Sequence, residues 1–248
     1  MSLTRIAAHR GGALEIAENA LTAFAHAARL GVEEVEFDVH LSADGVPMVH
    51  HDATLDRTTE GTGPLAARTA AELGQIRLRQ TVDERVPTLD TVLDQLQHSS
   101  LWLRIEIKPG VGGTLYPGLP HLVIDALAAR GLMARAGITS FFTDVLRDPA
   151  LMESRLPRLA LINPMVFHCI GGLDGLSQVL ALSGCTDFAL PIDTLDADLV
   201  AAARSRGLVP SSFATHTEAQ IGKAFDLGLP VFTSDRPSLA KRLRAARG

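Results

Sequence analysis

The feature that most constrains the fold is a repeated alternation of short apolar runs with segments of helical spacing. Strands that alternate with helices pair in parallel through right-handed crossovers. Eight such units in 248 residues predict an α/β TIM (β/α)8 barrel, as one domain over residues 1–248. An open doubly wound sheet is the alternative, but no G-x-G-x-x-G fingerprint supports it. The apolar runs that a helix follows are centred near residues 7, 36, 104, 139, 160, 188, 211 and 231.

A strong turn signal follows the second of these strands. Asp44-Gly45 separates two strand-like runs, which predicts a β-hairpin. In a plain hairpin register, residues 48–52 return alongside residues 36–40, and His51 lies beside Asp38. The returning strand is then antiparallel and not part of the barrel wall. Residues 53–87, which are irregular in pattern and contain Pro64, are expected to form a small insertion over one end of the domain.

Bulk properties narrow the class of partner and compartment. The net charge is −5 and no basic stripe is present, which argues against a nucleic-acid backbone as the partner. No run approaches the roughly 18 apolar residues of a membrane span, and the first residues lack the apolar region of a signal peptide. The two cysteines, Cys169 and Cys185, are interpreted as reduced thiols. A cytoplasmic protein without stable membrane insertion is expected, and the residues carry no signal for a particular oligomeric state.

Polar residues gather at the ends of the predicted strands, where (β/α)8 barrels place their active sites. Side chains in a strand alternate between faces, so Glu36 and Asp38 point the same way and the apolar residues between them point the other way. Glu106 and Lys108 share a face of the next barrel strand for the same reason. The set at the strand ends comprises His9, Arg10, Glu36, Asp38, His51, Glu106, Lys108, Thr233 and Asp235.

The three carboxylates of this set predict a metal site. Buried together without a counter-ion they would repel one another, so a cation is the simplest neutraliser. Glu36, Asp38 and Glu106 offer hard oxygen ligands, which favours one Mg²⁺ or Ca²⁺ over zinc, with Mn²⁺ as a further candidate. The alternative is that some of these carboxylates are only ion-paired with Arg10 or Lys108.

The histidines and cations of the set indicate phosphate chemistry. His9 and His51 are free for proton transfer, since imidazole titrates near neutral pH. His40 and His50 are expected to point away from the cluster. An arginine grips a phosphate through two parallel hydrogen bonds and a lysine acts as a point charge. The residues therefore favour a metal-assisted phosphodiesterase or phosphatase.

These residues are similar to those of a known family, the glycerophosphodiester phosphodiesterases, and the compact length looks like its cytoplasmic bacterial branch. The resemblance covers essentially the whole chain and is most specific in the first half. The matching motifs are His9-Arg10-Gly11, Glu18-Asn19, Glu36-Phe37-Asp38-Val39, Asp44-Gly45, His51-Asp52, Arg57-Thr58-Thr59, Pro87-Thr88-Leu89, Glu106-Ile107-Lys108, Ser140-Phe141 and residues 228–237.

The resemblance implies a set of roles. It implies a TIM barrel with a small insertion after the hairpin, and a divalent metal on the three carboxylates. It implies His9 and His51 as the general acid/base pair, with Arg10 and Lys108 near the phosphate. The substrates would be glycerophosphodiesters such as glycerophosphocholine and glycerophosphoethanolamine, hydrolysed to glycerol 3-phosphate and an alcohol.

The chain departs from the family on the seventh barrel strand, where a Trp-Thr-Val-Asn run is usual. Here the run is Phe213-Ala214-Thr215-His216. Phe213 keeps an aromatic wall for the glycerol or head group but lacks the indole N–H. His216 replaces an amide with a titratable ring.

Three other functions fit these residues less well. A related barrel phospholipase C would carry exposed apolar residues at its rim, whereas aromatic residues are only 4% of this chain. A metal amidohydrolase would need an H-x-H pair on the first strand, and His9-Arg10-Gly11 does not supply one. A non-catalytic glycerol-phosphate binding barrel could lose a histidine or a metal ligand, yet every one of them is present.

Overall fold

The computed structural model describes residues 3–247, and in it all eight predicted strands form one closed parallel barrel. β1 pairs with β9 on one side and with β2 on the other, which closes the ring. The strands of the barrel are β1 (Arg5–His9), β2 (Glu34–Leu41), β4 (Trp102–Ile107), β5 (Ala136–Ser140), β6 (Arg158–Leu161), β7 (Asp187–Pro191), β8 (Val209–Phe213) and β9 (Val231–Ser234).

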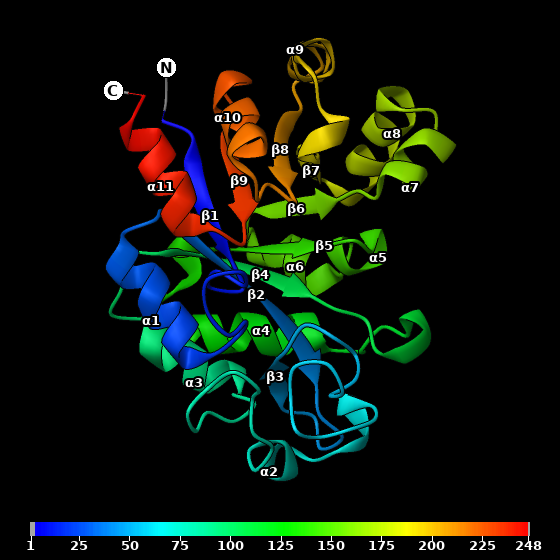
Figure 1. Ribbon diagram of the computed structural model, residues 1–248. Helices are drawn as coiled ribbons and strands as arrows, with labels where there is room; N and C mark the ends of the chain where they lie inside the picture. The colour runs from blue at the N-terminus through cyan, green and yellow to red at the C-terminus, as the bar shows by residue number, and fades with distance from the viewer. Residues whose placement is uncertain (1–2, 248) are drawn as a thin grey trace.

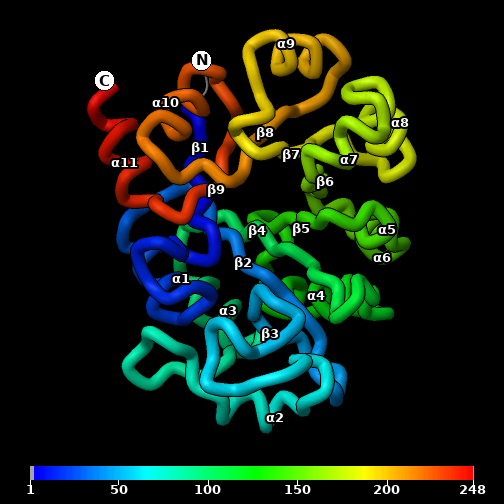
Figure 2. The backbone as a smooth tube through the Cα atoms, turned by 45° about the vertical axis from the view of Figure 1, so that its right-hand side comes forward, coloured from blue at the N-terminus to red at the C-terminus, as the bar shows by residue number. Residues whose placement is uncertain are grey.

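Helices surround the strands, and the last helix packs beside the first strand (Figures 1 and 2). None of the helices within residues 3–247 is long and apolar enough to cross a membrane. They are α1 (Leu21–Leu30), α2 (Ala70–Leu73), α3 (Leu89–Leu96), α4 (Leu119–Ala128), α5 (Thr143–Leu146), α6 (Pro149–Ser154), α7 (Pro164–Cys169), α8 (Leu173–Ser183), α9 (Ala197–Ser205), α10 (Glu218–Asp226) and α11 (Pro237–Ala245).

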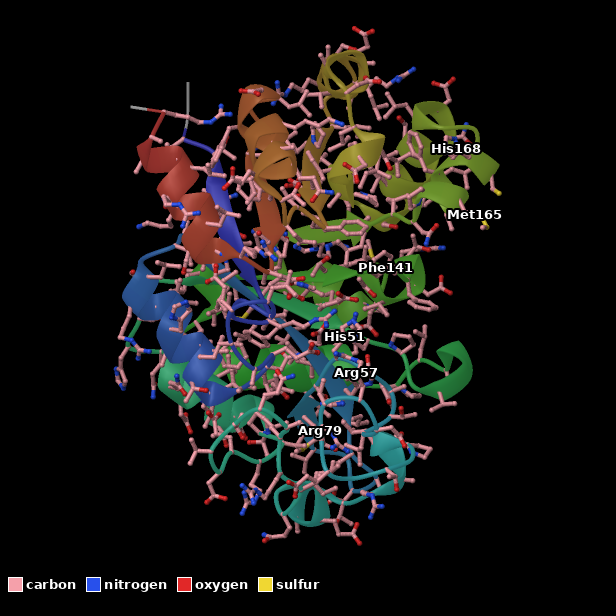
Figure 3. The ribbon with its side chains drawn as sticks, in the orientation of Figure 1. His51, Arg57, Arg79, Phe141, Met165 and His168 are labelled. Atoms are coloured by element: carbon pink, nitrogen blue, oxygen red, sulfur yellow. The ribbon has the colours of Figure 1, made fainter. Side chains whose placement is uncertain are left out.

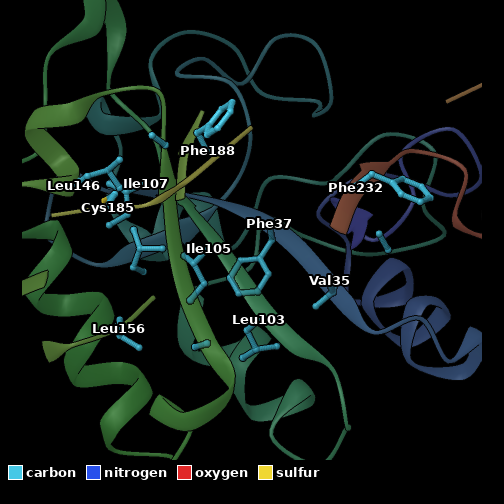
Figure 4. Packing of buried hydrophobic residues seen from close by; sticks show 14 of the residues in the cluster. Val35, Phe37, Leu103, Ile105, Ile107, Leu146, Leu156, Cys185, Phe188 and Phe232 are labelled. Carbon is cyan, nitrogen blue, oxygen red and sulfur yellow. The ribbon is translucent and has the colours of Figure 1, made fainter. Parts of the chain in front are cut away.

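The main apolar core lies between the barrel wall and this helical layer. Val35 and Phe37 of β2 and Ile105 of β4 are fully buried in it (Figure 4). The ring of Phe24 on α1 packs edge-on against Phe37, with 5.6 Å between the ring centroids. Because strand side chains alternate, the outward direction of Phe37 turns its neighbours Glu36 and Asp38 into the barrel. The burial of the apolar face thus aims both carboxylates at the barrel interior.

The hairpin after β2 forms as predicted, and residue 48 returns opposite residue 40, but the predicted placement of His51 directly beside Asp38 is wrong by one residue. β3 (Pro47–Val49) is antiparallel to β2, with Val39 opposite Val49. His50 donates its N–H to the carbonyl of Asp38 at 3.0 Å, so His50 and not His51 lies beside Asp38. The turn has three residues, 43–45, closed by the Ser42 N–H and the carbonyl of residue 46. This loop is one residue longer than the two-residue turn that an Asp-Gly pair often forms, and the longer loop places His50 opposite Asp38.

Residues 53–87 pack with the segment that follows β1 in a second, smaller apolar cluster. They contain the 3-10 turn η1 (Leu65–Ala67) and α2, which begins at a capping box formed by Thr69 and Glu72. The carboxylate of Glu84 accepts the N–H of Leu21 at the start of α1. This contact fixes the insertion beside the loop that follows β1. The second cluster consists of Ala17, Ala20, Ala23, Met48, Leu55, Leu65, Leu73, Leu78 and Val86.

Candidate active site

A cavity of about 640 Å³, counted with its open mouth, lies at the carboxyl ends of the barrel strands. One side of it is charged and the other is apolar. All the residues predicted to bind substrate or to transfer protons line this cavity, as do two of the three predicted metal ligands. Its lining comprises His9, Arg10, Glu36, His51, Arg104, Glu106, Lys108, Thr139, Phe141, Leu161, Phe213, Ala214, His216 and Thr233.

The three predicted metal ligands come together at the base of this cavity. Glu36 and Asp38 are contributed by β2 and Glu106 by β4, and the pairing of these strands places Asp38 opposite Glu106. Each residue offers a carboxylate oxygen within 4.8 Å of the others, and all three are buried. One oxygen of Glu36 and one of Asp38 are buried without a hydrogen-bond partner. An unsatisfied buried carboxylate oxygen is costly unless a cation faces it.

The pKa values of Glu36 and Asp38 shift in opposite directions because their charged neighbours differ. Burial, together with the neighbouring Asp38 carboxylate, raises the pKa of Glu36. Burial would also raise the pKa of Asp38, but the nearby Lys108 ammonium and other positive groups outweigh it and lower that pKa. The Lys108 Nζ lies 2.7 Å from a Glu106 oxygen and 3.2 Å from an Asp38 oxygen. Protein cations therefore offset only part of the negative charge of the cluster.

Arg10 holds the other side of the carboxylate cluster. Its backbone N–H donates to Glu36 at 3.1 Å, and its Nε lies 3.3 Å from an Asp38 oxygen. The residue adopts a left-handed backbone conformation, with φ of 51°, which is uncommon outside glycine. The guanidinium also donates to Glu18 at 3.0 Å. The turn after β1 thus brings both a backbone donor and a side-chain cation to the site.

His9 faces the cluster from β1. Its Nδ1 hydrogen-bonds to Asp235, which follows β9, and its Nε2 lies 3.8 Å from a Glu36 oxygen. Burial opposes protonation of the ring, yet the carboxylates of Glu36 and Asp235 raise the pKa of His9. Asp235 therefore binds one ring nitrogen of His9, Nδ1, and the other nitrogen, Nε2, faces the cavity.

His51 enters from the hairpin, past the end of its pairing with β2. Its Nδ1 lies 2.5 Å from an oxygen of Asp52. Asp52 accepts in turn from Arg57, which also donates two hydrogen bonds to Glu18. Figure 3 shows His51 and Arg57 as neighbours, with Phe141 on the same side of the molecule. Burial is the main cause that lowers the pKa of His51.

An aromatic pair forms the apolar side of the cavity. The rings of Phe141 and Phe213 pack edge-on, with 5.6 Å between their centroids. The Lys108 ammonium lies 6.0 Å from the centre of the Phe141 ring. The cavity thus brings the predicted Phe213 together with a second phenylalanine, beside the charged groups.

His40 does not point away from the cluster as expected. It shares a strand face with Glu36 and Asp38, because all three have the same parity on β2. Its buried ring contacts the Tyr116 hydroxyl at 3.2 Å and the His51 carbonyl at 3.0 Å, and it does not line the cavity. His50, which is also absent from the lining, contacts the Thr54 carbonyl through its Nε2. The structure therefore makes His40 a neighbour of the site through the His51 backbone.

Several residues at the site escape the sequence reasoning. The Asn19 side chain donates to Asp38 at 2.8 Å, although an asparagine before a helix is typical of a cap. Arg104 and Thr139 line the cavity, and the strand alternation that reveals Glu106 could have revealed Arg104 as well. Thr139, next to Glu106 across the β4–β5 pairing, is visible only once the register is known.

The fold and the site together define a class of protein: a (β/α)8 barrel with a buried carboxylate cluster that could hold a metal ion, and with two cationic side chains beside that cluster. Comparison with known proteins is consistent with this class and narrows it. The model of the glycerophosphoryl diester phosphodiesterase family matches residues 9–239. The chain belongs to this family of enzymes.

Individual relatives agree with the assignment. A crystal structure described as a glycerophosphoryl diester phosphodiesterase of Agrobacterium tumefaciens is 38% identical, with a TM-score of 0.95 over 99% of both chains. The glycerophosphodiester phosphodiesterase of Caldanaerobacter subterraneus is 35% identical over 171 residues, which cover 65% of this chain and 70% of that protein. An Oleispira antarctica phosphodiesterase, solved in complex with the product sn-glycerol-3-phosphate, has a TM-score of 0.82 at 24% identity. The match to mouse glycerophosphodiester phosphodiesterase 1 spans 33% of that protein.

Proposed function

We propose that this protein hydrolyses glycerophosphodiesters such as glycerophosphocholine and glycerophosphoethanolamine to glycerol 3-phosphate and an alcohol, with one divalent cation and two histidines. The observation that carries the proposal is the placement of His9 and His51 around one buried carboxylate cluster. The Oleispira relative holds glycerol 3-phosphate as product, which supports the same product here. The reaction needs a bound cation, a bound phosphate and two proton transfers, and the cavity offers a group for each.

The carboxylate cluster fits a divalent cation. Glu36 has a buried oxygen without a hydrogen-bond or ion-pair partner, and Asp38 and Glu106 complete a set of hard oxygen donors. We assign these three residues as the ligands of Mg²⁺ or Ca²⁺, with Mn²⁺ as a third candidate. A cation held there supplies positive charge that offsets the charge developing on the phosphate in the transition state.

The cations of the chain bind and orient the phosphate. Arg10 and Lys108 both line the cavity, and both contact the cluster through Asp38. A phosphate beside the metal ligands therefore meets two positive side chains from opposite sides of the cluster. Phe213, with its partner Phe141, provides an apolar wall for the organic part of the substrate. These contacts position the ester bond for attack.

The histidines move the protons. One of His9 and His51 removes a proton from the attacking hydroxyl, and the other protonates the leaving alcohol oxygen. Attack by the neighbouring glycerol hydroxyl gives a cyclic phosphate that water then opens, with the two histidines exchanging roles. Direct attack by water is the rival route. A substrate without the 2-hydroxyl separates the two routes, because normal turnover of it excludes the cyclic one.

The direct test is an assay of glycerol 3-phosphate release from glycerophosphocholine, with and without EDTA. Release that stops with EDTA and returns with added Mg²⁺ or Ca²⁺ supports the proposal. Binding of glycerol 3-phosphate without turnover would show a non-catalytic binding barrel instead.

The free thiols of Cys169 and Cys185 support our further assignment of the protein to the cytoplasm.

A further inference from the structure

Asp235 stands between two imidazole rings at the edge of the cavity. One of its oxygens hydrogen-bonds to the Nδ1 of His9, and the other lies 3.4 Å from the Nε2 of His216. The backbone N–H of Asp235 donates to the Nδ1 of His216 at 3.1 Å. The three side chains come from the ends of β1, β8 and β9, which are adjacent in the barrel. Each is largely sheltered, with side-chain exposures between 15% and 27%.

The direction of these hydrogen bonds fixes the protons. A backbone N–H can only donate, so the Nδ1 of His216 accepts and its Nε2 carries the hydrogen. The Asp235 carboxylate, in turn, accepts from the Nδ1–H of His9. The Nε2 of His9 remains the nitrogen that faces the cavity, 3.8 Å from Glu36.

We infer that Asp235 is a positioning residue for His9, and that His216 holds Asp235 in the orientation which that role requires. Asp235 selects the tautomer and the ring angle that leave the His9 Nε2 available for proton transfer. His216 accepts the backbone N–H of Asp235 and so anchors the main chain from which this carboxylate projects toward His9. The inference rests on the proposed catalytic role of His9, and it adds two residues to which that proposal gives no part.

The ring of His9 would not be fixed in this way by its other neighbours. Its second nitrogen is 3.8 Å from Glu36, which is too long for a hydrogen bond. Asp235 is thus the hydrogen-bond partner that orients the ring. An asparagine at position 235 would preserve the shape but could donate its amide hydrogen to Nδ1, which selects the wrong tautomer. Carboxylates that orient a catalytic histidine act in this manner.

The test compares kcat and KM for glycerophosphocholine in the metal-loaded enzyme and its variants. We expect Asp235→Asn to lower kcat by about 10- to 100-fold, the usual cost of losing a residue that orients a histidine, with KM little changed. In a His9→Ala background, the same substitution should cost nothing further, because the residue acts through His9. Asp125→Asn, which alters an exposed carboxylate on α4, serves as the control.

A second pair of variants tests the role of His216 and does not alter the carboxylate. His216→Asn keeps an acceptor for the Asp235 backbone N–H and should retain most of kcat, whereas His216→Leu removes the acceptor and should lower kcat with KM less affected. The inference would be overturned if Asp235→Asn lowered kcat equally in the wild type and in the His9→Ala background. It would also be overturned if the two His216 variants were equally active. Full activity of His9→Ala would instead overturn the proposed function, so the two failures are distinguishable.

Discussion

The two histidines of the site are supported by different arrangements. In each, Nδ1 bonds to a carboxylate: Asp52 behind His51, and Asp235 behind His9. Behind Asp52 stands Arg57, whose charge is permanent and whose fork also binds Glu18. Beside Asp235 lies His216, whose Nδ1 accepts the Asp235 backbone N–H at 3.1 Å. Beyond the two carboxylates, His51 is thus supported by a network of charged groups and His9 by one imidazole.

The origin of the two carboxylates also differs. Asp52 is the next residue after His51, whereas Asp235 is 226 positions from His9 and reaches it only because β1 and β9 pair to close the barrel. The His51 support is therefore local to the hairpin and the insertion, while the His9 support depends on barrel closure. A change in the insertion should affect His51 first, and a change in the seam between β1 and β9 should affect His9 first.

The largest predicted effect removes either histidine. His9→Ala and His51→Ala should each lower the rate of glycerol 3-phosphate release by at least about a hundredfold, the low end for general acid–base catalysis. Steady-state kinetics on glycerophosphocholine measures this directly. His121→Ala, which changes an exposed histidine on α4, should leave the rate unchanged. Near-normal activity of either variant would show that the histidine it removes is not needed for proton transfer.

The next effect tests the carboxylate behind His51. Asp52→Asn should lower kcat by about 10- to 100-fold, because the amide can donate to the ring where the carboxylate accepted. Kinetics should show a smaller change in KM than in kcat. Asp56→Asn, which alters an exposed carboxylate in the same loop, provides the control. A wild-type rate for Asp52→Asn would show that the hairpin fixes His51 without its neighbour.

A smaller effect is expected from the permanent charge behind Asp52. The Arg57 side chain is 47% exposed, and ion pairs of this exposure contribute about 1 kcal/mol or less. Arg57→Lys should therefore lower kcat a few-fold at most, through loss of the fork that joins Asp52 to Glu18. In the same assay, the kcat of the wild type should change little between low and high salt, even though salt screens the exposed ion pair of Arg57. A loss as large as that of Asp52→Asn would mean that Arg57 itself contacts substrate.

The last prediction concerns the free energy of unfolding and its dependence on acid, not the rate of the reaction. His40, whose ring contacts the His51 carbonyl, is buried, and burial lowers its pKa to about 4. The unfolded chain binds a proton near the ordinary histidine pKa of about 6.5. Stability from neutral His40 is therefore fully present above that value and is lost as the pH falls toward 4, by roughly 3 kcal/mol in all. Urea unfolding across this range should show a flatter dependence in His40→Gln than in the wild type; identical slopes would contradict this account.

Sequence reasoning predicts the parts of this molecule that depend on local periodicity. The eight barrel strands, the hairpin and the faces of Glu36 and Glu106 follow from alternation within single strands. The residue directly opposite Asp38 does not, because the Asp-Gly signal is compatible with loops of two or three residues. The Asp235 contact does not either, since it requires the pairing of the first and last strands. Local rules thus place Asp235 among the residues at the strand ends but do not show that it contacts His9.

The central claim is that the histidines act on a phosphate held at a metal bound by Glu36, Asp38 and Glu106. Its most direct test is release of glycerol 3-phosphate from glycerophosphocholine by chelated protein, as Mg²⁺ or Ca²⁺ is added back to the wild type and to Glu36→Gln. The wild type should be inactive after chelation and recover with added cation, while Glu36→Gln should not recover at the same concentrations. Full activity of the wild type in excess chelator, or equal recovery of both proteins, would contradict the claim.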